Sequence, residues 1–485
     1  MLPASLCAKI MVFRRITRII EVVLNERAVG CTHNNLFFRS RGKLNYVIFV
    51  PEYFVTENME IAELYKCFME CGKVTTDSRN CPEGSMFIAL KGETFNGNAF
   101  AAQALKQGCR YAVIDEPEYA GEGTILVDNC LQALQQLANY HRRQLKTPVI
   151  GITGTNGKTT TKELISTVLS RKFNTLYTEG NFNNHIGVPL TLLRLTKEHE
   201  MAVVEMGANH PGEIKTLVHI AEPDYGIITN VGKAHLQGFG SFEGVIHTKG
   251  ELYDFLRAKG GATIFIQNEN PYLNGIAEGL TCVRYGQTAG LYVSGELISC
   301  SPFLSFRWTA EGVSHEVNTH LIGSYNLDNM LAAAAIGRYF GVSDDDISSA
   351  LASYLPHNNR SQLKETADNK LIVDAYNANP TSMMAALKNF RQVEAPHKMV
   401  ILGDMKELGE ASREEHQKVV DYLKECGFDR VVLVGPEFAA ATHSYQTFQH
   451  VDEVLADIRI HKPQGYYILI KGSNSMKLSQ LPEYL

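Results

Sequence analysis

Val149–Glu163 reads VIGITGTNGKTTTKE, and this stretch decides the fold expected for the chain. Its beginning, residues 148–152, is a short apolar run typical of a buried strand in a parallel sheet. Residues 161–173 carry apolar side chains at helical spacing. The turn between them is rich in Gly, Thr and Asn. A strand, a glycine-rich turn, Lys-Thr and a helix together predict a phosphate-binding loop, in which backbone N–H groups and a helix N-terminus face the phosphates.

This loop departs from the strict phosphate-loop pattern at one position. Ile152 stands where that pattern has its first glycine. An ordinary strand–turn–helix junction that contains Gly-Lys-Thr is therefore the alternative interpretation. The additional glycine inside the turn, Gly154, favours the phosphate loop. In such a loop Lys158 would reach the β- and γ-phosphates, and the Thr159 hydroxyl would ligate Mg²⁺.

Length and composition limit the class of protein. A chain of 485 residues predicts two to four domains, and 45% hydrophobic with 20% charged residues is typical of a globular protein. The net charge of −6 argues against general nucleic-acid binding. Apolar runs of membrane-span length are absent from the sequence, so stable membrane insertion is not expected. The ten scattered cysteines predict free thiols in a cytoplasmic protein.

Residues 1–58 differ from the rest because Arg and Lys outnumber Glu there. A clean apolar core followed by a small-residue cleavage site is missing, so a signal peptide is not expected. Residues 10–24 could form an amphipathic helix at a membrane surface. The favoured interpretation is an N-terminal extension outside the folded domains, with Met59 as a plausible domain start.

The remaining chain predicts an α/β protein of three domains. Residues 59–146 form a small α/β domain, residues 147–357 a central P-loop domain, and residues 358–485 a Rossmann-like domain. Strands alternate with helices in the central domain, which predicts a mostly parallel sheet covered on both faces. Its expected strands are 148–152, 201–205, 226–229 and 262–266. Residues 280–320 are expected to be a short antiparallel insertion.

Polar residues follow several of the predicted strands at their carboxyl ends, which is where ligands bind to parallel sheets. Glu205, Asn230 and His235 lie at or just beyond strand ends of the central domain. The carboxylate of Glu205 and the imidazole of His235 suggest metal ligands or water-positioning groups. The alternatives are a surface glutamate and a core histidine, but both residues share an edge of the sheet with the phosphate loop, which favours a site.

The run 181–185 offers three Asn and one His for a polar substrate, or equally for turns. In the third domain the strand-end residues are Asp374, Tyr376, Asn377, Asn379 and Asp404.

The loop Thr153–Thr160 resembles the ATP loop of the Mur ligase family, whose version also lacks the strict first glycine. Four further stretches resemble one member of that family: Asn181–Leu190, Glu205–Ala208, Asp374–Pro380 and Gly403–Gly409. The resemblance covers about residues 59–485. It implies an ATP-dependent amide ligase that joins D-alanyl-D-alanine to UDP-N-acetylmuramoyl-tripeptide through an acyl phosphate. A ligase of the family that adds a single amino acid, and an ATP-binding module without ligase activity, are the alternatives.

The resemblance also implies roles for individual residues. It places ATP at Gly154, Thr155, Asn156, Gly157, Lys158, Thr159, Thr160, Asn326, Asn329, Arg360 and Asp374. It implies two Mg²⁺ ions held by Thr159, Glu205, His235 and Lys249, the last as a lysine carbamylated by CO₂. Lys158, His235, Lys249 and Arg360 are the implied catalytic residues. Ser78, Arg79, Asn184, Tyr376, Asn377 and Asn379 are the implied substrate contacts, with Ser78 and Arg79 on the uridine nucleotide. A monomer is expected.

Overall fold

The structure is a computed structural model, and it describes residues 28–32, 35–40, 43–49, 60–356 and 362–485. The chain divides into two compact units, Met1–Cys130 and Leu131–Leu485. The predicted helix at 10–24 and the predicted site residue Arg360 lie outside the described residues. Within the first 58 residues, three strands form an antiparallel sheet: β1 (Ala28–Thr32), β2 (Asn35–Ser40) and β3 (Lys43–Phe49). The assignment of residues 1–58 to an extension outside the folded domains stays a prediction.

The first unit contains a parallel sheet of four strands in the order β4-β5-β6-β7. The strands are β4 (Val74–Thr75), β5 (Met86–Ile88), β6 (Tyr111–Ile114) and β7 (Thr124–Leu126), and the α-helices α2 (Ile61–Cys71) and α3 (Ala101–Lys106) accompany them. The sequence predicts a helix over residues 61–71 and a strand over residues 111–114, and both are confirmed. The helix α2 buries Leu64 and Phe68 and ends at Gly72, whose φ of 64° gives the left-handed termination that favours glycine.

The second unit begins with α4 (Cys130–Leu145) and contains a sheet of nine strands. Their order is β16-β15-β14-β13-β12-β11-β8-β10-β9. The strands are β8 (Val149–Thr153), β9 (Thr175–Tyr177), β10 (Met201–Glu205), β11 (Tyr225–Ile228), β12 (Thr263–Gln267), β13 (Thr281–Gly286), β14 (Val293–Cys300), β15 (Phe303–Ala310) and β16 (Val313–Ile322). All neighbours from β9 to β14 pair in parallel, as the alternation of strands and helices predicts.

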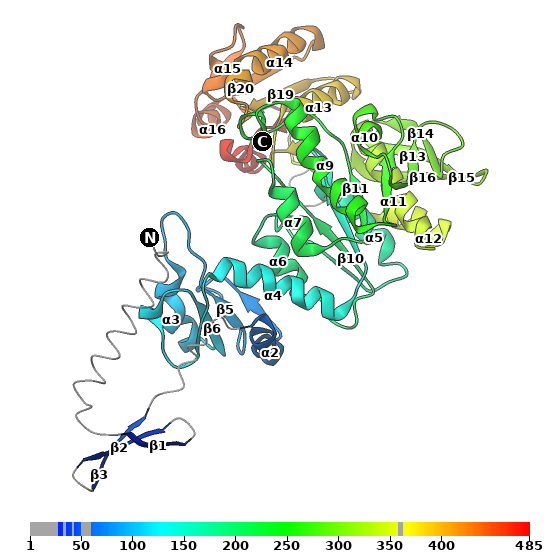
Figure 1. The fold of residues 1–485 in the computed structure, drawn as a ribbon. Coiled ribbons are helices and arrows are strands. Elements are labelled where there is room, and N and C mark those ends of the chain that lie inside the picture. The colour runs from blue at the N-terminus through cyan, green and yellow to red at the C-terminus, as the bar shows by residue number, and fades with distance from the viewer. Residues whose placement is uncertain (1–27, 33–34, 41–42, 50–59, 357–361) are drawn as a thin grey trace. The chain divides into compact units, whose positions relative to one another are not determined.

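The predicted antiparallel insertion at 280–320 is only partly right. The strands β14, β15 and β16 are antiparallel to one another. The strand β13, however, pairs in parallel with β12 and extends the main sheet. It can do so because α10 (Pro271–Ile276) lies between β12 and β13 in the chain and provides the crossover that parallel neighbours need. The strands β13, β14, β15 and β16 are labelled together with α10, α11 and α12 in Figure 1.

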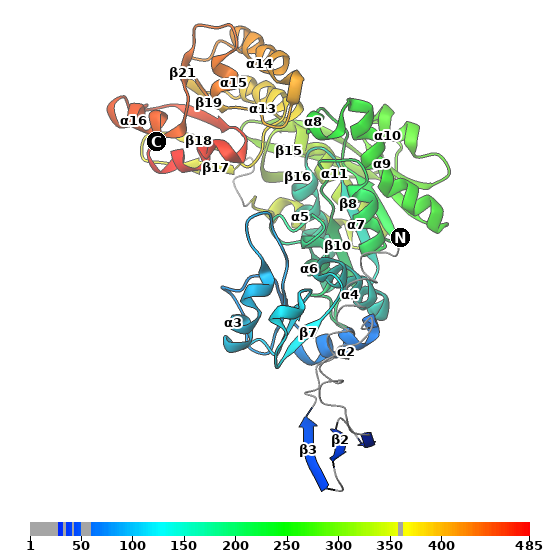
Figure 2. The ribbon, with the colours of Figure 1, turned by 60° about the vertical axis from the view of Figure 1, so that its left-hand side comes forward.

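Helices cover both faces of the nine-stranded sheet, and β8 shows how its sequence permits this. Ile150 and Ile152 are fully buried in one core. Gly151 faces the other way, where an added Cβ would lie 3.3 Å from Leu252 and 3.1 Å from Pro223. The helices of this region are α5 (Lys158–Leu169), α6 (Gly187–Leu192), α7 (Glu213–Ala221), α8 (Leu236–Phe239), α9 (Phe242–Lys259), α11 (Leu327–Tyr339) and α12 (Asp344–Ser353). The mostly parallel, doubly covered α/β sheet is therefore confirmed (Figures 1 and 2).

The last part of the chain forms a second sheet, of six strands in the order β17-β18-β22-β19-β20-β21. The strands are β17 (Gln362–Glu365), β18 (Lys370–Asp374), β19 (Lys398–Gly403), β20 (Arg430–Val434), β21 (Gln446–Phe448) and β22 (Tyr467–Lys471). The helices are α13 (Pro380–Gln392), α14 (Ser412–Cys426), α15 (Pro436–Ala439) and α16 (Val451–Ile460). The apolar runs 371–374, 398–404, 431–435 and 467–472 predict the four central strands, and these are confirmed. The edge strands β17 and β21 were missed because neither contains a buried apolar run.

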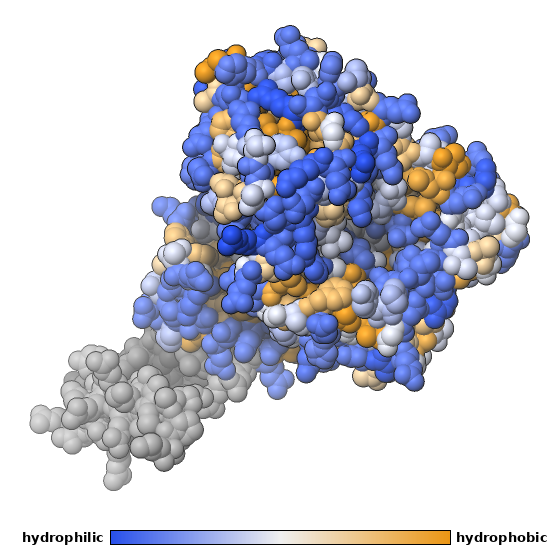
Figure 3. Space-filling model, turned by 90° about the horizontal axis from the view of Figure 1, so that it is seen from above, coloured by the Kyte–Doolittle hydropathy of each residue, from blue (hydrophilic) through white to orange (hydrophobic). Residues whose placement is uncertain are grey.

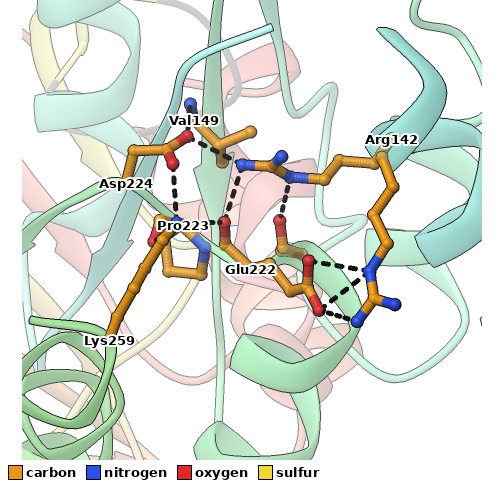
Figure 4. Close-up of polar contacts among 8 residues, drawn as sticks. Arg142, Val149, Glu222, Pro223, Asp224 and Lys259 are labelled. Carbon is orange, nitrogen blue, oxygen red and sulfur yellow. Dashed lines mark hydrogen bonds and ion pairs between the residues drawn. The ribbon is translucent and has the colours of Figure 1, made fainter. Parts of the chain in front are cut away.

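The helix α4 is fastened to the nine-stranded sheet by a buried arginine (Figure 4). Arg142 donates through Nε to Ala221 O at 2.9 Å and through Nη2 to Glu222 O and Asp224 Oδ2, both at 2.7 Å. The same carboxylate oxygen of Asp224 accepts from the backbone N–H of Val149, at the start of β8, at 2.9 Å. One network therefore joins α4 to the strand that leads into the phosphate loop.

We expect Arg142→Ala to lower the free energy of unfolding by about 3 kcal/mol, because the change leaves buried carbonyls and a carboxylate without their donor. Chemical denaturation of the intact chain measures this. The matched control is Arg143→Ala, because Arg143 is 60% exposed and also pairs with Glu222. A surface ion pair contributes about 0–1 kcal/mol, so the control should change little. Equal losses in both variants would contradict the assignment of Arg142 as the anchor.

The surface view in Figure 3 is mostly hydrophilic, with smaller hydrophobic areas among the charged residues. Such a mixture is usual for folded proteins in water. Within the described part of the chain, helices sufficiently long and apolar to cross a bilayer are lacking. The cysteines whose side chains are described carry free thiols, which confirms that part of the prediction.

Candidate active site

The phosphate loop follows β8 directly, and its two inner glycines are sterically required. A Cβ at Gly154 would lie 2.0 Å from Thr229 Oγ1, and one at Gly157 would lie 2.8 Å from Asn329 Oδ1. Gly157 has a φ of 76° and α5 begins at the next residue, Lys158. The Lys158 ammonium folds back over the loop and donates to Gly154 O at 2.8 Å and Thr155 O at 3.1 Å. The loop thus has the compact cradle form that its sequence predicts.

The end of the neighbouring strand β11 holds this loop in shape. Thr229 Oγ1 donates to Asn156 O at 2.7 Å, and Asn230 Nδ2 donates to the same oxygen at 3.0 Å. Asn230 Oδ1 accepts from the Asn156 N–H at 3.0 Å. The position of Asn230 at a strand end identified it in the sequence as a candidate site residue. Thr229 lies within the predicted strand, so the sequence did not indicate its role in the loop.

A buried carboxylate lies beside the first turn of α5. Glu205 ends β10 and is 1% exposed, and its Oε1 accepts from Thr159 Oγ1 at 3.1 Å and from Asn183 Nδ2 at 2.8 Å. Its other oxygen, Oε2, is buried without a hydrogen-bond partner among the described residues. Asn183 was missed in favour of Asn184, whose Oδ1 instead accepts from the N–H groups of Ile186 and Gly187 in a turn. The sequence alone could not show which of these two adjacent asparagines contacts Glu205.

The donor set at Thr159 and Glu205 fits a magnesium ion. A hydroxyl and a buried carboxylate with a bare oxygen are the hard oxygen ligands that Mg²⁺ takes. Among the residues described here, three or more His, Cys, Asp or Glu side chains do not gather at metal-binding distance. The fit therefore rests on these two residues, and the roles of His235 and Lys249 as metal ligands stay predictions.

Lys249 lies in α9 and is 2% exposed, with Nζ donating to Ala208 O at 3.2 Å and lying 5.1 Å from the centre of the Phe239 ring. Burial, and then repulsion by the Lys158 charge, lowers the pKa of Lys249 well below its usual value. The amine is thus biased toward its neutral, nucleophilic form, which is the form that can react with CO₂.

His235 precedes α8 with a φ of 49°, and its Nδ1 is hydrogen-bonded to Glu407 Oε2. Burial lowers the pKa of His235, while the Glu407 carboxylate acts in the opposite direction. Glu407 lies in the run Gly403–Gly409 singled out by its resemblance, but its pairing with His235 could not be predicted, because 172 positions separate the two residues.

The two asparagines expected on the adenine side are buried and bonded to each other. Asn329 Nδ2 donates to Asn326 Oδ1 at 2.8 Å, and Thr161 Oγ1 donates to Asn329 Oδ1 at 3.0 Å. These bonds tie the start of α11 to α5, next to the phosphate loop. Both residues also line the main cavity described below.

The strand ends of the six-stranded sheet contribute a second group of residues. Asp374 ends β18 and pairs through Oδ2 with Lys471 Nζ at 2.5 Å. Asn379 caps α13 by accepting from the Ser382 N–H at 2.9 Å, and its Nδ2 donates to Asn156 Oδ1 at 2.8 Å. Asn379 therefore links the six-stranded sheet to the phosphate loop. The buried Lys471 was missed because a lysine at the end of an apolar strand usually lies in solvent.

A cavity of about 820 Å³ unites most of these residues. The predicted residues on its wall are Thr155, Asn156, Gly157, Lys158, Thr159, Thr160, Asn184, Glu205, His235, Asn326, Asn329, Asp374, Tyr376, Asn377 and Asn379. A smaller cavity of about 260 Å³ shares His235, Tyr376, Asn377 and Asn379 with it and adds Lys406 and Ser473.

Ser78 and Arg79 belong to the first unit, whereas the residues that line this cavity belong to the second. Arg79 Nη2 pairs with Asp77 Oδ2 at 2.8 Å on an exposed turn. Their predicted contact with a uridine nucleotide stays a prediction.

Three family models match: the Mur ligase family catalytic domain over residues 71–142, the Mur ligase middle domain over 152–337, and the Mur ligase glutamate ligase domain over 359–474. The chain is 36% identical over 425 residues to the Bacillus subtilis protein named UDP-N-acetylmuramoyl-tripeptide–D-alanyl-D-alanine ligase, covering 84% of this chain and 92% of that protein.

Solved structures agree with the sequence comparison. A crystal structure of MurF from Acinetobacter baumannii aligns with a TM-score of 0.79 and 33% identity, covering 88% of this chain and 98% of the other. MurF from Thermotoga maritima, solved in complex with ADP, aligns with a TM-score of 0.76 and 26% identity, covering 85% and 96%.

Proposed function

Because this chain belongs to the Mur ligase family, we propose that it joins D-alanyl-D-alanine to UDP-N-acetylmuramoyl-tripeptide at the expense of ATP. The products are ADP, phosphate and the UDP-linked pentapeptide precursor of peptidoglycan. The observation that carries the proposal is the 820 Å³ cavity, whose wall combines a phosphate loop with strand-end residues of a second α/β sheet. A nucleotide and an acceptor can therefore share one space.

The chemistry requires activation of a carboxylate, which is a poor acyl donor. Transfer of the γ-phosphoryl group of ATP to the tripeptide carboxylate gives an acyl phosphate. The neutral amine of the dipeptide then attacks the acyl carbon, so that a C–N bond forms, the amine releases a proton to solvent, the C–O bond to phosphate breaks and phosphate leaves. Among the described residues, Lys158 places its ammonium against the phosphate loop, where it would stabilise negative charge on the transferred phosphoryl group. Arg360 is proposed to assist it.

Thr159 and Glu205 would hold Mg²⁺, which neutralises phosphate charge during phosphoryl transfer when it is bound. His235 and a carbamate on Lys249 are proposed for a second ion. Asn326, Asn329 and Asp374 are proposed to contact the nucleoside, and Ser78 and Arg79 the uridine nucleotide.

The smaller cavity suits the dipeptide. It measures about 260 Å³ and adjoins His235, which the main cavity shares. Tyr376, Asn377 and Asn379 supply polar groups, and the Lys406 side chain supplies a cation for a terminal carboxylate. This placement would bring the dipeptide amine to the edge of the phosphate-binding space.

Phosphate release decides between this function and its alternatives. Purified protein is incubated with ATP, Mg²⁺ and UDP-N-acetylmuramoyl-tripeptide, together with D-alanyl-D-alanine, D-alanine, L-glutamate or a diamino acid. We expect tripeptide-dependent phosphate release with the dipeptide alone, and mass spectrometry should find the pentapeptide adduct. Release with a single amino acid would identify another ligase of the family. Hydrolysis without any adduct would identify a non-ligase ATP-binding module.

A cytoplasmic location and a monomeric state complete the proposal. ATP and the free thiols of the described cysteines are both consistent with a reducing cytoplasm. Sedimentation of the purified chain tests the monomer.

A further inference from the structure

The segment after β11 docks onto the run Gly403–Gly409, a stretch singled out in the sequence of which the proposed reaction uses Lys406 alone. His235 Nδ1 is hydrogen-bonded to Glu407 Oε2, and the Gln237 N–H donates to Glu407 O at 3.3 Å. Lys233 Nζ pairs with Glu415 Oε1 at 3.0 Å beside them. Two contacts therefore hold this segment against the run Gly403–Gly409, and the third holds it against α14 of the same six-stranded region.

Both partners of the central contact have a backbone conformation that non-glycine residues rarely adopt. His235 has a φ of 49° and Glu407 a φ of 63°. Such conformations persist where the surroundings enforce them, and they concentrate at functional sites. The backbone of each segment is therefore bent so that these two side chains meet.

We propose that Glu407 is a positioning residue, which fixes His235 in one tautomer and one orientation toward the active-site cavity. A carboxylate accepts only, so the bonded Nδ1 must carry the proton. In a neutral imidazole the free lone pair then lies on Nε2. His235 lines both cavities, and its Nε2 is thereby kept available as a ligand or base.

The nearby charged groups cannot readily replace Glu407. The Lys406 ammonium is 3.2 Å from Asp404 Oδ2, and Asp404 is wholly buried, where its oxygens accept from the N–H groups of Glu437 and Phe438. Glu415 is engaged by Lys233 and by Lys418. Glu407, which is 53% exposed, has its charge aimed at the imidazole.

Histidine nitrogen NMR tests the tautomer directly, without substrates. Protein selectively labelled with ¹⁵N-histidine is compared in long-range ¹H–¹⁵N spectra, with His235→Gln used to assign the signal. We expect the Nδ1–H form in the unmodified chain and a shift to mainly Nε2–H in Glu407→Ala. The control Glu410→Ala removes an exposed glutamate three residues further on and should leave the signal unchanged. An Nε2–H form in the unmodified chain would overturn the proposal.

Metal binding provides a second readout and, unlike the first, rests on the proposed function. Mn²⁺ affinity is measured by electron paramagnetic resonance in the presence of a non-hydrolysable ATP analogue. Loss of a carboxylate behind a ligating histidine weakens metal binding about 10- to 100-fold, so Glu407→Ala should lower the affinity by at least about tenfold while nucleotide affinity changes less than about twofold.

Glu407→Gln guards against a folding defect in the alanine variant. It keeps the size and one acceptor oxygen, and a severalfold loss of Mn²⁺ affinity is expected from the lost charge. Unchanged affinity in both variants would overturn the role toward the metal. Absence of pentapeptide product from the unmodified chain would refute the proposed function instead, and the tautomer result would still stand.

Discussion

Replacing Lys158 with alanine is expected to lower kcat about a thousandfold. Removal of one preorganised hydrogen-bond donor from a site that stabilises a transition state lowers the rate about 10²–10³-fold. Lys158 is such a donor, because its ammonium folds over the phosphate loop. Its Nζ donates to Gly154 O and Thr155 O, so the side chain also closes the loop. Steady-state phosphate release with saturating tripeptide and dipeptide measures the effect.

The control for this loss is Lys197→Ala, since Lys197 is an exposed lysine remote in sequence from the phosphate loop. It should retain activity within about twofold. Binding of a fluorescent ATP analogue should weaken in Lys158→Ala, with a smaller change than that in kcat. A variant that keeps more than about a tenth of the rate would exclude Lys158 from stabilising the transferred phosphoryl group.

Most of the fold follows from local pattern. Continuous apolar runs such as 201–205 give buried parallel strands. The alanine-rich run 327–339 predicts a helix, and α11 has these bounds, as α2 has the bounds predicted for 61–71. The phosphate loop was identified by residue types that its geometry requires, because a Cβ on Gly154 or Gly157 would collide with neighbouring side chains.

What the sequence could not predict depends on contacts between distant segments. The parallel pairing of β13 with β12 depends on the crossover through α10, and nothing in the local pattern of residues 281–286 distinguishes a parallel from an antiparallel neighbour. In the same way Asn183, rather than Asn184, donates to Glu205 because the turn before α6 directs the two amides to different partners.

The site itself shows the same division. Strand-end position identified Glu205, His235 and Asp374, since the carboxyl ends of parallel strands gather at one edge. Their partners Glu407 and Lys471 lie 172 and 97 positions away and become visible only in the folded chain. That a residue lies at the edge of the sheet can be predicted from the local sequence pattern. Its hydrogen-bond partners depend on how distant segments meet in the fold, so they cannot be predicted in the same way.

Lys249→Ala is expected to reduce activity about a hundredfold or more. Lys249 is 2% exposed and feels the charge of Lys158. Because both effects disfavour the ammonium form, the pKa of Lys249 lies well below its usual value. The neutral amine can add to CO₂: an N–C bond forms, a proton passes to solvent and a carbamate anion results. Carbamylation would therefore replace repulsion from Lys158 by attraction, and it would supply the oxygen ligand proposed for the second metal ion.

Three measurements distinguish this role from a structural one. Chloride or a small carboxylate such as acetate should partly restore Lys249→Ala, because an exogenous anion can occupy the space left by a carbamate, and it should not stimulate the unmodified chain. Bicarbonate should restore CO₂-depleted unmodified protein while leaving the variant unchanged. A carbamate signal should appear in ¹³C spectra after incubation with ¹³C-bicarbonate and should be absent from the variant. Activity within about threefold of the unmodified chain would remove Lys249 from the mechanism, because a buried, neutral lysine would then serve only to fill the space beside Phe239.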